Sequence, residues 1–540
     1  MEGGPSWIVD EVLFMSTTDR LIKDIVRERR FHFRLFIEGI VVGIFSGGVI
    51  ALFRYILTAS EVYRPEIYKT VATAFYEGKY SEPLAYAASF ILIALLLAKL
   101  LKNEPMCSGS GIPQLKGVLM GKMNMKWASV LFSKLIGGIL AIGAGLSLGR
   151  EGPSVQIGAC VGQGVSRSAV RTRYEERILM TAGAGAGLAA AFNAPLAGVI
   201  FCLEELQKTF SPMVLMSSIT ASVTATTVSQ LIFGGMPVFH FDELAVFPLS
   251  LYGILIVFGI FIGLLGRVFN KTLIFSLDTY DRLKLRNEVK IFVPLAMAGL
   301  LGFILPDILG GGGTMVNALA SHQYSLIFLG ILFLGKFLYT AISFGSGVPG
   351  GIFLPMLVLG ACGGGIFSSM LLSQGLLPKP YVGDLIVFGM AAYFSAVVKS
   401  PVTASVLIME MTGSFQHLLP LICVSMTAYL VADLTGGKPV YEELLARSLK
   451  IKEKMGEGVS GRRVALELVV ASGSAADKLL LRDLVLPPQT TIVDIKRGLQ
   501  RISPRDDTRL YAGDYIYLLT NDTDSSALKK LLGEGKIPER

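Results

Sequence analysis

The stretch Gly345-Ser-Gly-Val-Pro-Gly-Gly-Ile-Phe-Leu-Pro355 interrupts an apolar run of this 540-residue chain with glycines and prolines. Two shorter stretches, Gly109-Ser-Gly-Ile-Pro113 and Gly149-Arg-Glu-Gly-Pro153, interrupt other apolar runs in the same way. Glycine permits a sharp turn of the backbone, and proline is tolerated in the first turn of a helix. Each stretch therefore predicts a helix that begins inside an apolar region.

The chain as a whole is too apolar for a soluble protein. Charged residues make up 17% of it, against about 25% in typical soluble proteins, and the mean hydropathy is +0.59. Apolar residues gather in blocks near 35–53, 84–101, 130–147, 178–203, 245–265, 290–305, 325–344 and 385–432. Many of these blocks approach the roughly 20 residues that a helix needs to cross a bilayer. The sequence predicts an all-α polytopic membrane protein, embedded in the lipid bilayer.

Helix starts at membrane depth have a chemical consequence. Unwound backbone there is viable only where protein or a wet cavity satisfies its polar groups. A helix start exposes unpaired N–H donors and about half a positive elementary charge, which suits an anion. Three converging starts would replace much of the hydration of a halide and still let it leave. The breaks therefore favour anion transport. The alternative is that they are kinks that allow close helix packing.

The membrane part also contains a weak internal repeat. At an offset of 202, six residues recur: Pro153, Gly158, Ala159, Cys160, Gly162 and Ser166 as Pro355, Gly360, Ala361, Cys362, Gly364 and Ser368. At an offset of 206, four more recur: Gly183, Ala190, Pro195 and Glu204 as Gly389, Ala396, Pro401 and Glu410. Duplicated transporters often relate their halves by an axis in the membrane plane, which brings equivalent helix ends together. Chance similarity between glycine-rich helices is the alternative.

Carboxylates in apolar segments are costly and therefore functional candidates. Glu151 lies at a predicted helix start, where its carboxylate would compete with an anion for the same N–H groups, and protonation would release it. Pairing with Arg150 is the alternative. Glu204 and Glu205 end an apolar segment, either as a solvated helix end or as a proton relay. Lys134, Lys336 and Lys399 are interpreted as snorkelling residues or structural counter-charges.

The two ends of the chain differ from the membrane part, predicted at 35–445. Basic residues lie just before it, among them Arg27, Arg29, Arg30 and Arg34. Because basic segments remain in the cytoplasm, residues 1–34 are predicted to be a cytoplasmic segment of a cell (inner) membrane protein. An apolar helical face is expected at Trp7, Ile8, Val12, Leu13 and Phe14. Residues 446–461 are predicted to be a charged linker and 462–540 a small cytosolic α+β domain, with strands at 464–470 and 514–520 and a helix at 492–502.

Several functional classes lose support. Gly345–Gly350 also fits G-x-G-x-x-G, but it lies in an apolar run rather than in a βαβ unit. No Walker lysine motif and no TVGYG filter sequence occurs. The five cysteines, Cys107, Cys160, Cys202, Cys362 and Cys423, lack metal-site spacing. We expect no cofactor, no metal, no nucleic-acid partner and no enzymatic activity.

Taken together, the three motifs resemble the CLC chloride channel and transporter family over roughly residues 35–450. GSGIP, GREGP and GGIFLP occur in that order, followed by Gly436-Gly-Lys-Pro-Val-Tyr441. The resemblance implies a homodimer of inverted-repeat subunits, each with its own anion pathway. It makes Ser110 and Tyr441 hydroxyl donors to a central anion, together with the backbone amides of Ile352 and Phe353.

The resemblance also assigns the two glutamates. Glu151 matches the gating glutamate that occupies the outer anion position and takes up protons. Glu205 matches the internal proton glutamate that exchangers usually carry and channels usually lack. Ser110 is the residue of chloride-type members. The expected function is therefore chloride/proton antiport. A passive voltage- or pH-gated chloride channel is the alternative.

Residues 462–532 resemble a TrkA-C domain, the C-terminal domain of RCK proteins. The resemblance rests on the stretches Val464–Val470, Pro504–Asp507 and Leu510–Tyr517. Such domains are usually cytosolic ligand sensors or dimerisation modules of bacterial transporters, so a small-molecule or ion ligand is expected. A cation transporter controlled by this domain is a remote alternative.

Overall fold

The computed structural model describes residues 6–239, 241, 244–283, 285–321, 324–454, 463–471, 473–488, 490–498, 500–521, 528, 531 and 532. Residues 6–30, 320, 321, 452–454, 463–465 and 521 are described by their backbone alone. The chain divides into two compact units, Met1–Leu445 and Ala446–Arg540. Each unit is described here by itself.

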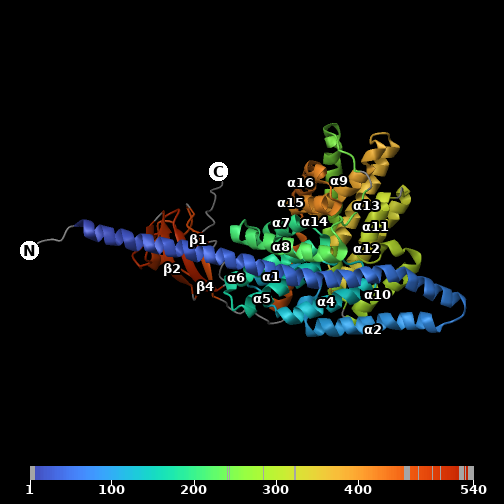
Figure 1. Cartoon of the computed structure of the whole chain (residues 1–540), viewed down its shortest axis with the longest axis horizontal. Coiled ribbons are helices and arrows are strands. Elements are labelled where there is room, and N and C mark those ends of the chain that lie inside the picture. Colours follow the sequence, from blue (N-terminus) through green and yellow to red (C-terminus); the bar gives the residue numbers. More distant parts are fainter. Residues whose placement is uncertain are drawn as a thin grey trace, which may run out of the picture. The chain divides into compact units, whose positions relative to one another are not determined.

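The first unit is helical (Figure 1). Its helices are α1 (Ser6–Tyr76), α2 (Ser81–Asn103), α3 (Ile112–Leu119), α4 (Trp127–Gly143), α5 (Glu151–Ser168), α6 (Arg173–Phe192), α7 (Pro195–Phe201), α8 (Pro212–Phe233), α9 (Tyr252–Arg282), α10 (Asn287–Ile304), α11 (Gly313–Ser321), α12 (Leu326–Gly345), α13 (Phe353–Ser373), α14 (Val382–Val398), α15 (Pro401–Thr412), α16 (Leu418–Leu434) and α17 (Val440–Lys454). A π-helical turn, η2 (Cys202–Gln207), follows α7.

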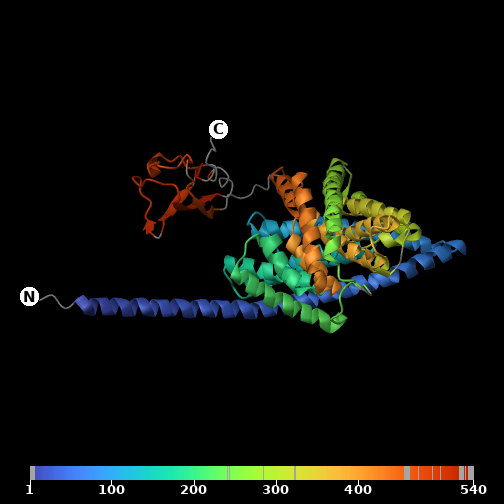
Figure 2. The same cartoon turned by 90° about the horizontal axis from the view of Figure 1, so that it is seen from above.

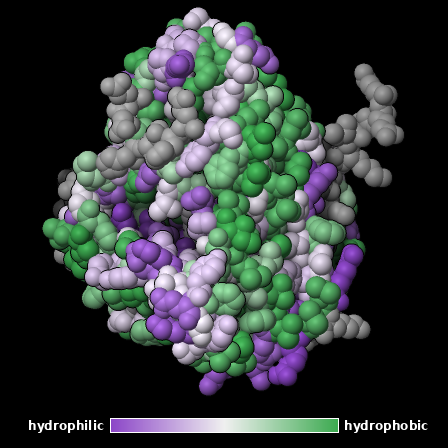
Figure 3. Space-filling view, turned by 90° about the vertical axis from the view of Figure 1, so that its right-hand side faces the viewer, coloured by the Kyte–Doolittle hydropathy of each residue, from purple (hydrophilic) through white to green (hydrophobic). Residues whose placement is uncertain are grey.

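Within the described ranges, eight helices are long and apolar enough to cross a membrane. Figure 3 shows apolar side chains over much of one face of the molecule. The prediction of an all-α polytopic membrane unit is confirmed. The longest apolar block, 385–432, contains three helices, α14, α15 and α16. It is divided before Pro401, which begins α15, and at Gly413, which follows it with a φ of 68°.

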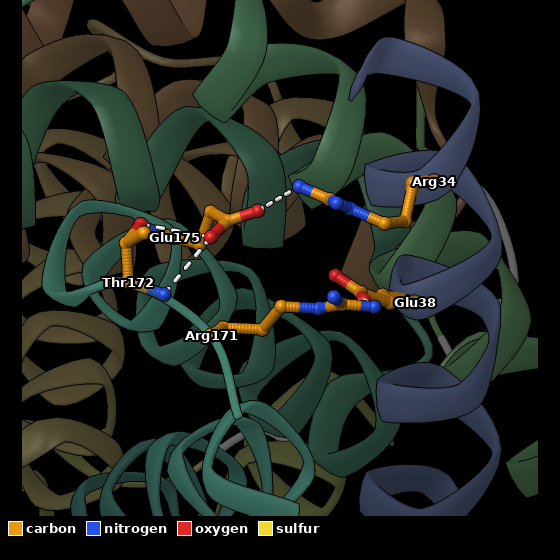
Figure 4. A network of polar contacts seen from close by, with 5 residues as sticks. All are labelled: Arg34, Glu38, Arg171, Thr172 and Glu175. Atoms are coloured by element: carbon orange, nitrogen blue, oxygen red, sulfur yellow. Dashed lines mark hydrogen bonds and ion pairs between the residues drawn. The ribbon is translucent and has the colours of Figure 1, made fainter. Parts of the chain in front are cut away.

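Helix α1 is one continuous helix across the predicted boundary between residues 34 and 35 (Figure 1, Figure 2). The side chains of the predicted apolar face at residues 7–14 lie outside those described. Figure 4 shows how α1 is tied to the turn between α5 and α6: Arg34 pairs with Glu175, and Arg171 pairs with Glu38 at 2.6 Å. Glu175 also completes a capping box with Thr172 at the start of α6.

The internal repeat is a structural repeat. In the first half, a Cβ added to Gly158 would lie 2.0 Å from the carbonyl oxygen of Gly183, so α5 and α6 touch through their backbones. In the second half, a Cβ on Gly360 would lie 2.3 Å from the carbonyl oxygen of Gly389, which joins α13 to α14. These four glycines are among the residues that recur in the sequence, so the alternative of chance similarity is wrong.

The two halves also cap each other. Glu204 accepts hydrogen bonds from the amides of Val402 (3.2 Å) and Thr403 (2.6 Å) at the start of α15. Its repeat partner Glu410, on α15, accepts hydrogen bonds from two amides at the start of α7, those of Leu196 (3.1 Å) and Ala197 (2.8 Å). Helices α7 and α15 therefore run antiparallel, as an inverted repeat requires.

The second unit contains an antiparallel sheet in the order β1-β4-β2-β3. Its strands are β1 (Arg463–Val469), β2 (Thr491–Arg497), β3 (Gln500–Ile502) and β4 (Tyr515–Asn521), so both predicted strands are confirmed. Arg497 donates two hydrogen bonds of 2.8 Å to the buried carboxylate of Asp514. The predicted linker is helical as far as Lys454, because α17 continues into it, and residues 455–461 lie outside the described ranges.

The helix predicted at 492–502 is wrong, because these residues form the β2–β3 hairpin. Gly498, with a φ of 59°, lies in the turn after Arg497 pairs with Gln500. The ladder between β2 and β4 shifts register between Ile492 and Asp494. Such a bulge inserts one residue into a strand. Because of the bulge, Ile492 and Ile495 lie on the same face of the sheet although they are three positions apart. In a regular strand, residues two positions apart share a face, so the spacing of these isoleucines resembles that of a helix.

Candidate anion site

The three predicted helix starts exist and meet. Helices α3, α5 and α13 begin at Ile112, Glu151 and Phe353. The loops before them are joined by backbone hydrogen bonds. Gly109 donates to Gly347 (3.2 Å) and accepts from Gly350 (3.0 Å), while Gly149 and Gly351 exchange two bonds of 2.7 and 2.8 Å. The glycine-proline stretches, which come from both halves of the repeat, thus build one junction.

Close approach explains why glycine is needed in this junction. A Cβ on Gly152 would lie 2.4 Å from the Oγ of Ser110, so a side chain there would displace the serine. Gly111, just before α3, has a φ of 94°, a conformation that side chains disfavour. The two glycines keep the starts of α3 and α5 in contact around Ser110.

Two buried hydroxyl groups face this junction. Ser110 precedes α3, and Tyr441 lies in the first turn of α17, with its hydroxyl near that of Ser110 but outside hydrogen-bond geometry. Neither Ser110 Oγ nor Tyr441 OH has a hydrogen-bond partner among the residues that the structure describes. Buried polar groups are rarely left unpaired. These two hydroxyls therefore fit a small polar ligand between them.

Glu151 is fully buried at the start of α5. Its Oε2 accepts a hydrogen bond of 3.3 Å from the amide of Leu354 in the first turn of α13, and its Oε1 has no partner in the described part of the chain. Ile352 and Phe353 are also fully buried at this helix start, whose first amides have no intrahelical acceptor. The carboxylate thus reaches from one helix start to the amides of another.

Glu205 lies on the π-helical turn η2, and 1% of its surface is exposed. Its Oε1 is 2.7 Å from the Nζ of the buried Lys116, and its Oε2 accepts a hydrogen bond of 2.9 Å from Ser400. Tyr441 is within electrostatic range of both Glu205 and Glu151. The alternative of a solvated helix end is wrong for Glu205, whereas the neighbouring Glu204 caps α15.

Lys116 and Ser400 are the residues of this region that the sequence reasoning missed. Lys116 belongs to α3, the helix that follows Ser110. Ser400 directly precedes α15, the helix that Glu204 caps. A single lysine inside the short apolar stretch after GSGIP was the available signal for Lys116. Ser400 offered none besides its place before the repeated proline.

The comparisons with known proteins agree with this geometry. The voltage gated chloride channel family model matches residues 89–433, and the TrkA-C domain model matches residues 465–533. The H(+)/Cl(-) exchange transporter ClcA of Citrobacter koseri is 33% identical over 475 residues, which cover 86% of this chain and 98% of that relative. The transporter of the same name from Salmonella agona is 36% identical over 379 residues, 68% of this chain and 79% of the relative.

Solved structures show the same fold. A slow cyanobacterial Cl−/H+ antiporter matches with a TM-score of 0.73 and 34% identity, over 78% of this chain and 99% of the other. A eukaryotic CLC transporter, 24% identical, matches with a TM-score of 0.64 over 78% and 74% of the two chains. The resemblances found in the sequence are thereby confirmed: the chain belongs to the voltage-gated chloride channel (CLC) family, and a TrkA-C domain follows its membrane unit.

Proposed function

We propose that this protein exchanges chloride for protons across a membrane. The observation that carries the proposal is the pair of buried, unpartnered hydroxyls of Ser110 and Tyr441 at the meeting point of three helix starts in the described part of the chain, beside the carboxylate of Glu151. Helix starts with unsatisfied donors favour anions. The names of the relatives, which are H+/Cl− exchangers, support the same choice of ions.

In this proposal Glu151 and chloride compete for one position. The amide of Leu354 donates to the Glu151 carboxylate, and an anion in that place would accept the same bond. Protonation removes the charge that holds the carboxylate there, so the side chain leaves and an anion enters. The hydroxyls of Ser110 and Tyr441, with the amides of Ile352 and Phe353, hold the central anion.

Glu205 supplies protons from the cytoplasmic side. Its burial and its ion pair with Lys116 support a role beyond that of a solvated helix end. Tyr441 is in electrostatic range of both this glutamate and Glu151. The proton route and the anion route therefore share the region around Tyr441.

Flux in proteoliposomes, followed with chloride and pH electrodes together, tests the proposal. Glu151→Gln is expected to conduct chloride without moving protons, and Glu205→Gln to lose proton movement while anion binding survives. Glu204→Gln is the matched control, since an amide oxygen can still cap α15, and it should keep coupling. Uphill proton movement by Glu151→Gln would contradict the role of Glu151. A wild-type protein whose reversal potential ignores the pH gradient would be a passive channel.

The proposal includes a membrane orientation and a dimer. Arg34 and Arg171 lie at the same end of the first unit, joined to Glu175 and Glu38, and basic ends face the cytoplasm. Both termini are assigned to that side of the cell (inner) membrane. Helices α8, α15 and α16 expose apolar side chains, among them Val223, Val402 and Met426. Self-association through this surface would cover them, which subunit counting by photobleaching tests.

The TrkA-C unit is assigned a regulatory role that depends on a small-molecule or ion ligand. Removing the chain after Lys454 should leave chloride-coupled proton movement intact and change only its dependence on that ligand. Loss of basal exchange in a well-folded truncated protein would show that this unit is part of the transport machinery instead.

A further inference from the structure

Two lysines occupy equivalent places in the two halves of the membrane unit. Lys134 on α4 and Lys336 on α12 are related by the first of the two repeat offsets, and both are fully buried. Among the residues that the structure describes, neither forms an ion pair. They are therefore not snorkelling residues, and no carboxylate in the described ranges lies in direct contact with either ammonium group.

Both lysines hold a loop that leads into a short helix. Lys134 Nζ donates to the carbonyls of Cys107 (2.9 Å) and Gly109 (2.6 Å), before α3. Lys336 Nζ donates to the carbonyls of Ile308 (3.0 Å) and Gly310 (2.7 Å), before α11. In both loops the two acceptors are separated by one residue, so each lysine binds the same two positions of equivalent loops.

The backbone confirms that the loops are equivalent. Gly109 and Gly310 have φ angles of 58° and 60°, and Gly111 and Gly312 have φ angles of 94° and 88°. The residue between the two glycines is Ser110 in the first loop and Gly311 in the second. The loop before α11 is thus a second copy of the Ser110 loop that lacks the hydroxyl.

This second loop packs against the start of α13, the helix whose first amides lie beside the Glu151 carboxylate. A Cβ on Gly311 would lie 2.7 Å from the side chain of Leu354, whose amide donates to the Glu151 carboxylate. A Cβ on Gly312 would lie 2.9 Å from the side chain of Val358, on the second turn of α13, and 3.1 Å from the Nζ of Lys336. Gly311, Leu354 and Arg150 also line a small cavity of about 40 Å³. The loop therefore forms part of the packing around Leu354, whose amide donates to the Glu151 carboxylate.

We propose that Lys336 is a positioning residue of the transport cycle: it fixes the loop 308–312 so that Leu354 presents its amide to Glu151. The inference rests on the proposed function, in which this amide alternates between the carboxylate and the anion. Lys336 acts through the loop and touches no ion itself. Burying an ammonium group at this depth costs free energy. The two hydrogen bonds of Lys336 to loop carbonyls offset part of that cost and hold the loop in place.

A double-mutant cycle tests the proposal. Lys336→Met removes the charge and the hydrogen bonds at similar size. It should reduce chloride turnover at least about 10-fold in the wild-type background, because small displacements at a reacting group have large effects on rate. In the Glu151→Ala background no carboxylate has to return to the Leu354 amide, and a mobile anion can adjust to a displaced donor, so the same change should cost less than about 2-fold. Lys336→Arg, which keeps the charge and donors, should restore most of the turnover.

Equal reductions in both backgrounds would assign Lys336 a merely structural role and overturn the proposal, as would an unchanged turnover of Lys336→Met. If Lys336→Met does not fold, Gly311→Ala gives the same test, since its methyl group pushes directly on Leu354. Gly330→Ala is its control, because the added methyl on α12 meets no described atom within 4 Å. A wild-type protein without proton coupling would refute the exchange function, but the chloride turnover ratios would still decide the role of Lys336.

Discussion

The backbone contact between α5 and α6 allows a sharp prediction for Gly158→Ala. The added methyl would lie 2.0 Å from the carbonyl oxygen of Gly183, whereas ordinary van der Waals contact begins at 3.4 Å, so the two helices must separate by more than an ångström. The nearest atoms to the added methyl all belong to the backbone of Gly183 and Gly187, so no flexible side chain can move aside. Overpacking of a close-packed interior costs about 1–3 kcal/mol, and more when the backbone must shift.

The expected result is a protein with a lower midpoint of thermal unfolding in detergent and little chloride flux, because α5 carries Glu151 at its start. Gly360→Ala should behave alike, since its methyl would lie 2.3 Å from the carbonyl oxygen of Gly389. Gly253→Ala on α9 is the control, because its methyl would meet no described atom within 4 Å. A Gly158→Ala protein with wild-type unfolding midpoint and flux would refute the reasoning that backbone contact sets this spacing.

Three further predictions concern single side chains. Lys116→Met leaves the Glu205 carboxylate buried without its cation, which should lower the free energy of unfolding by about 3–5 kcal/mol. A lower midpoint of thermal unfolding is expected, and the additional change Glu205→Gln should restore most of the lost stability. Ser400→Ala removes one hydrogen bond and should cost only about 1 kcal/mol by the same measurement. A larger loss for Ser400→Ala than for Lys116→Met would contradict this order. In the TrkA-C unit, burial alone would raise the pKa of Asp514, but the hydrogen bonds and charge of Arg497 hold it below its usual 3.8. The resulting stability is present above about pH 4 and lost as the pH falls through the lowered value. The protection factors of the β4 amides in the full chain, which are corrected for the intrinsic exchange rate, should therefore fall in acid. An Asp514→Asn protein should show no such fall.

The helix starts could be predicted from the sequence because their causes are local. Glycine permits the left-handed turn at Gly111, and proline at Pro153 suits the first turn of a helix, whatever surrounds them. The partners of Glu205 could not be predicted, because Lys116 and Ser400 are 89 and 195 residues away from it in the chain. One sequence without relatives contains no record of such contacts.

Other features were hidden for different reasons. The loop before α11 shares only glycines with the Ser110 loop. The equivalence of the two loops is therefore seen in their backbone φ angles and not in their amino-acid sequences. The continuity of α1 was missed because the change from charged to apolar residues near 34 looks like a boundary, although no helix-breaking residue stands there. The β2 strand was misread because its bulge gives Ile492 and Ile495 a helical spacing.

The reciprocal caps of α7 and α15 have a consequence for biosynthesis. When the ribosome has completed α7, the amides of Leu196 and Ala197 still lack their acceptor, Glu410, which is synthesised only near the end of the membrane unit. In the same way, the Glu204 carboxylate lacks its donors until the amides of Val402 and Thr403 have been synthesised. The two caps can therefore form only after the second half has been synthesised, and a half expressed alone lacks the groups that the other half supplies to its helix ends.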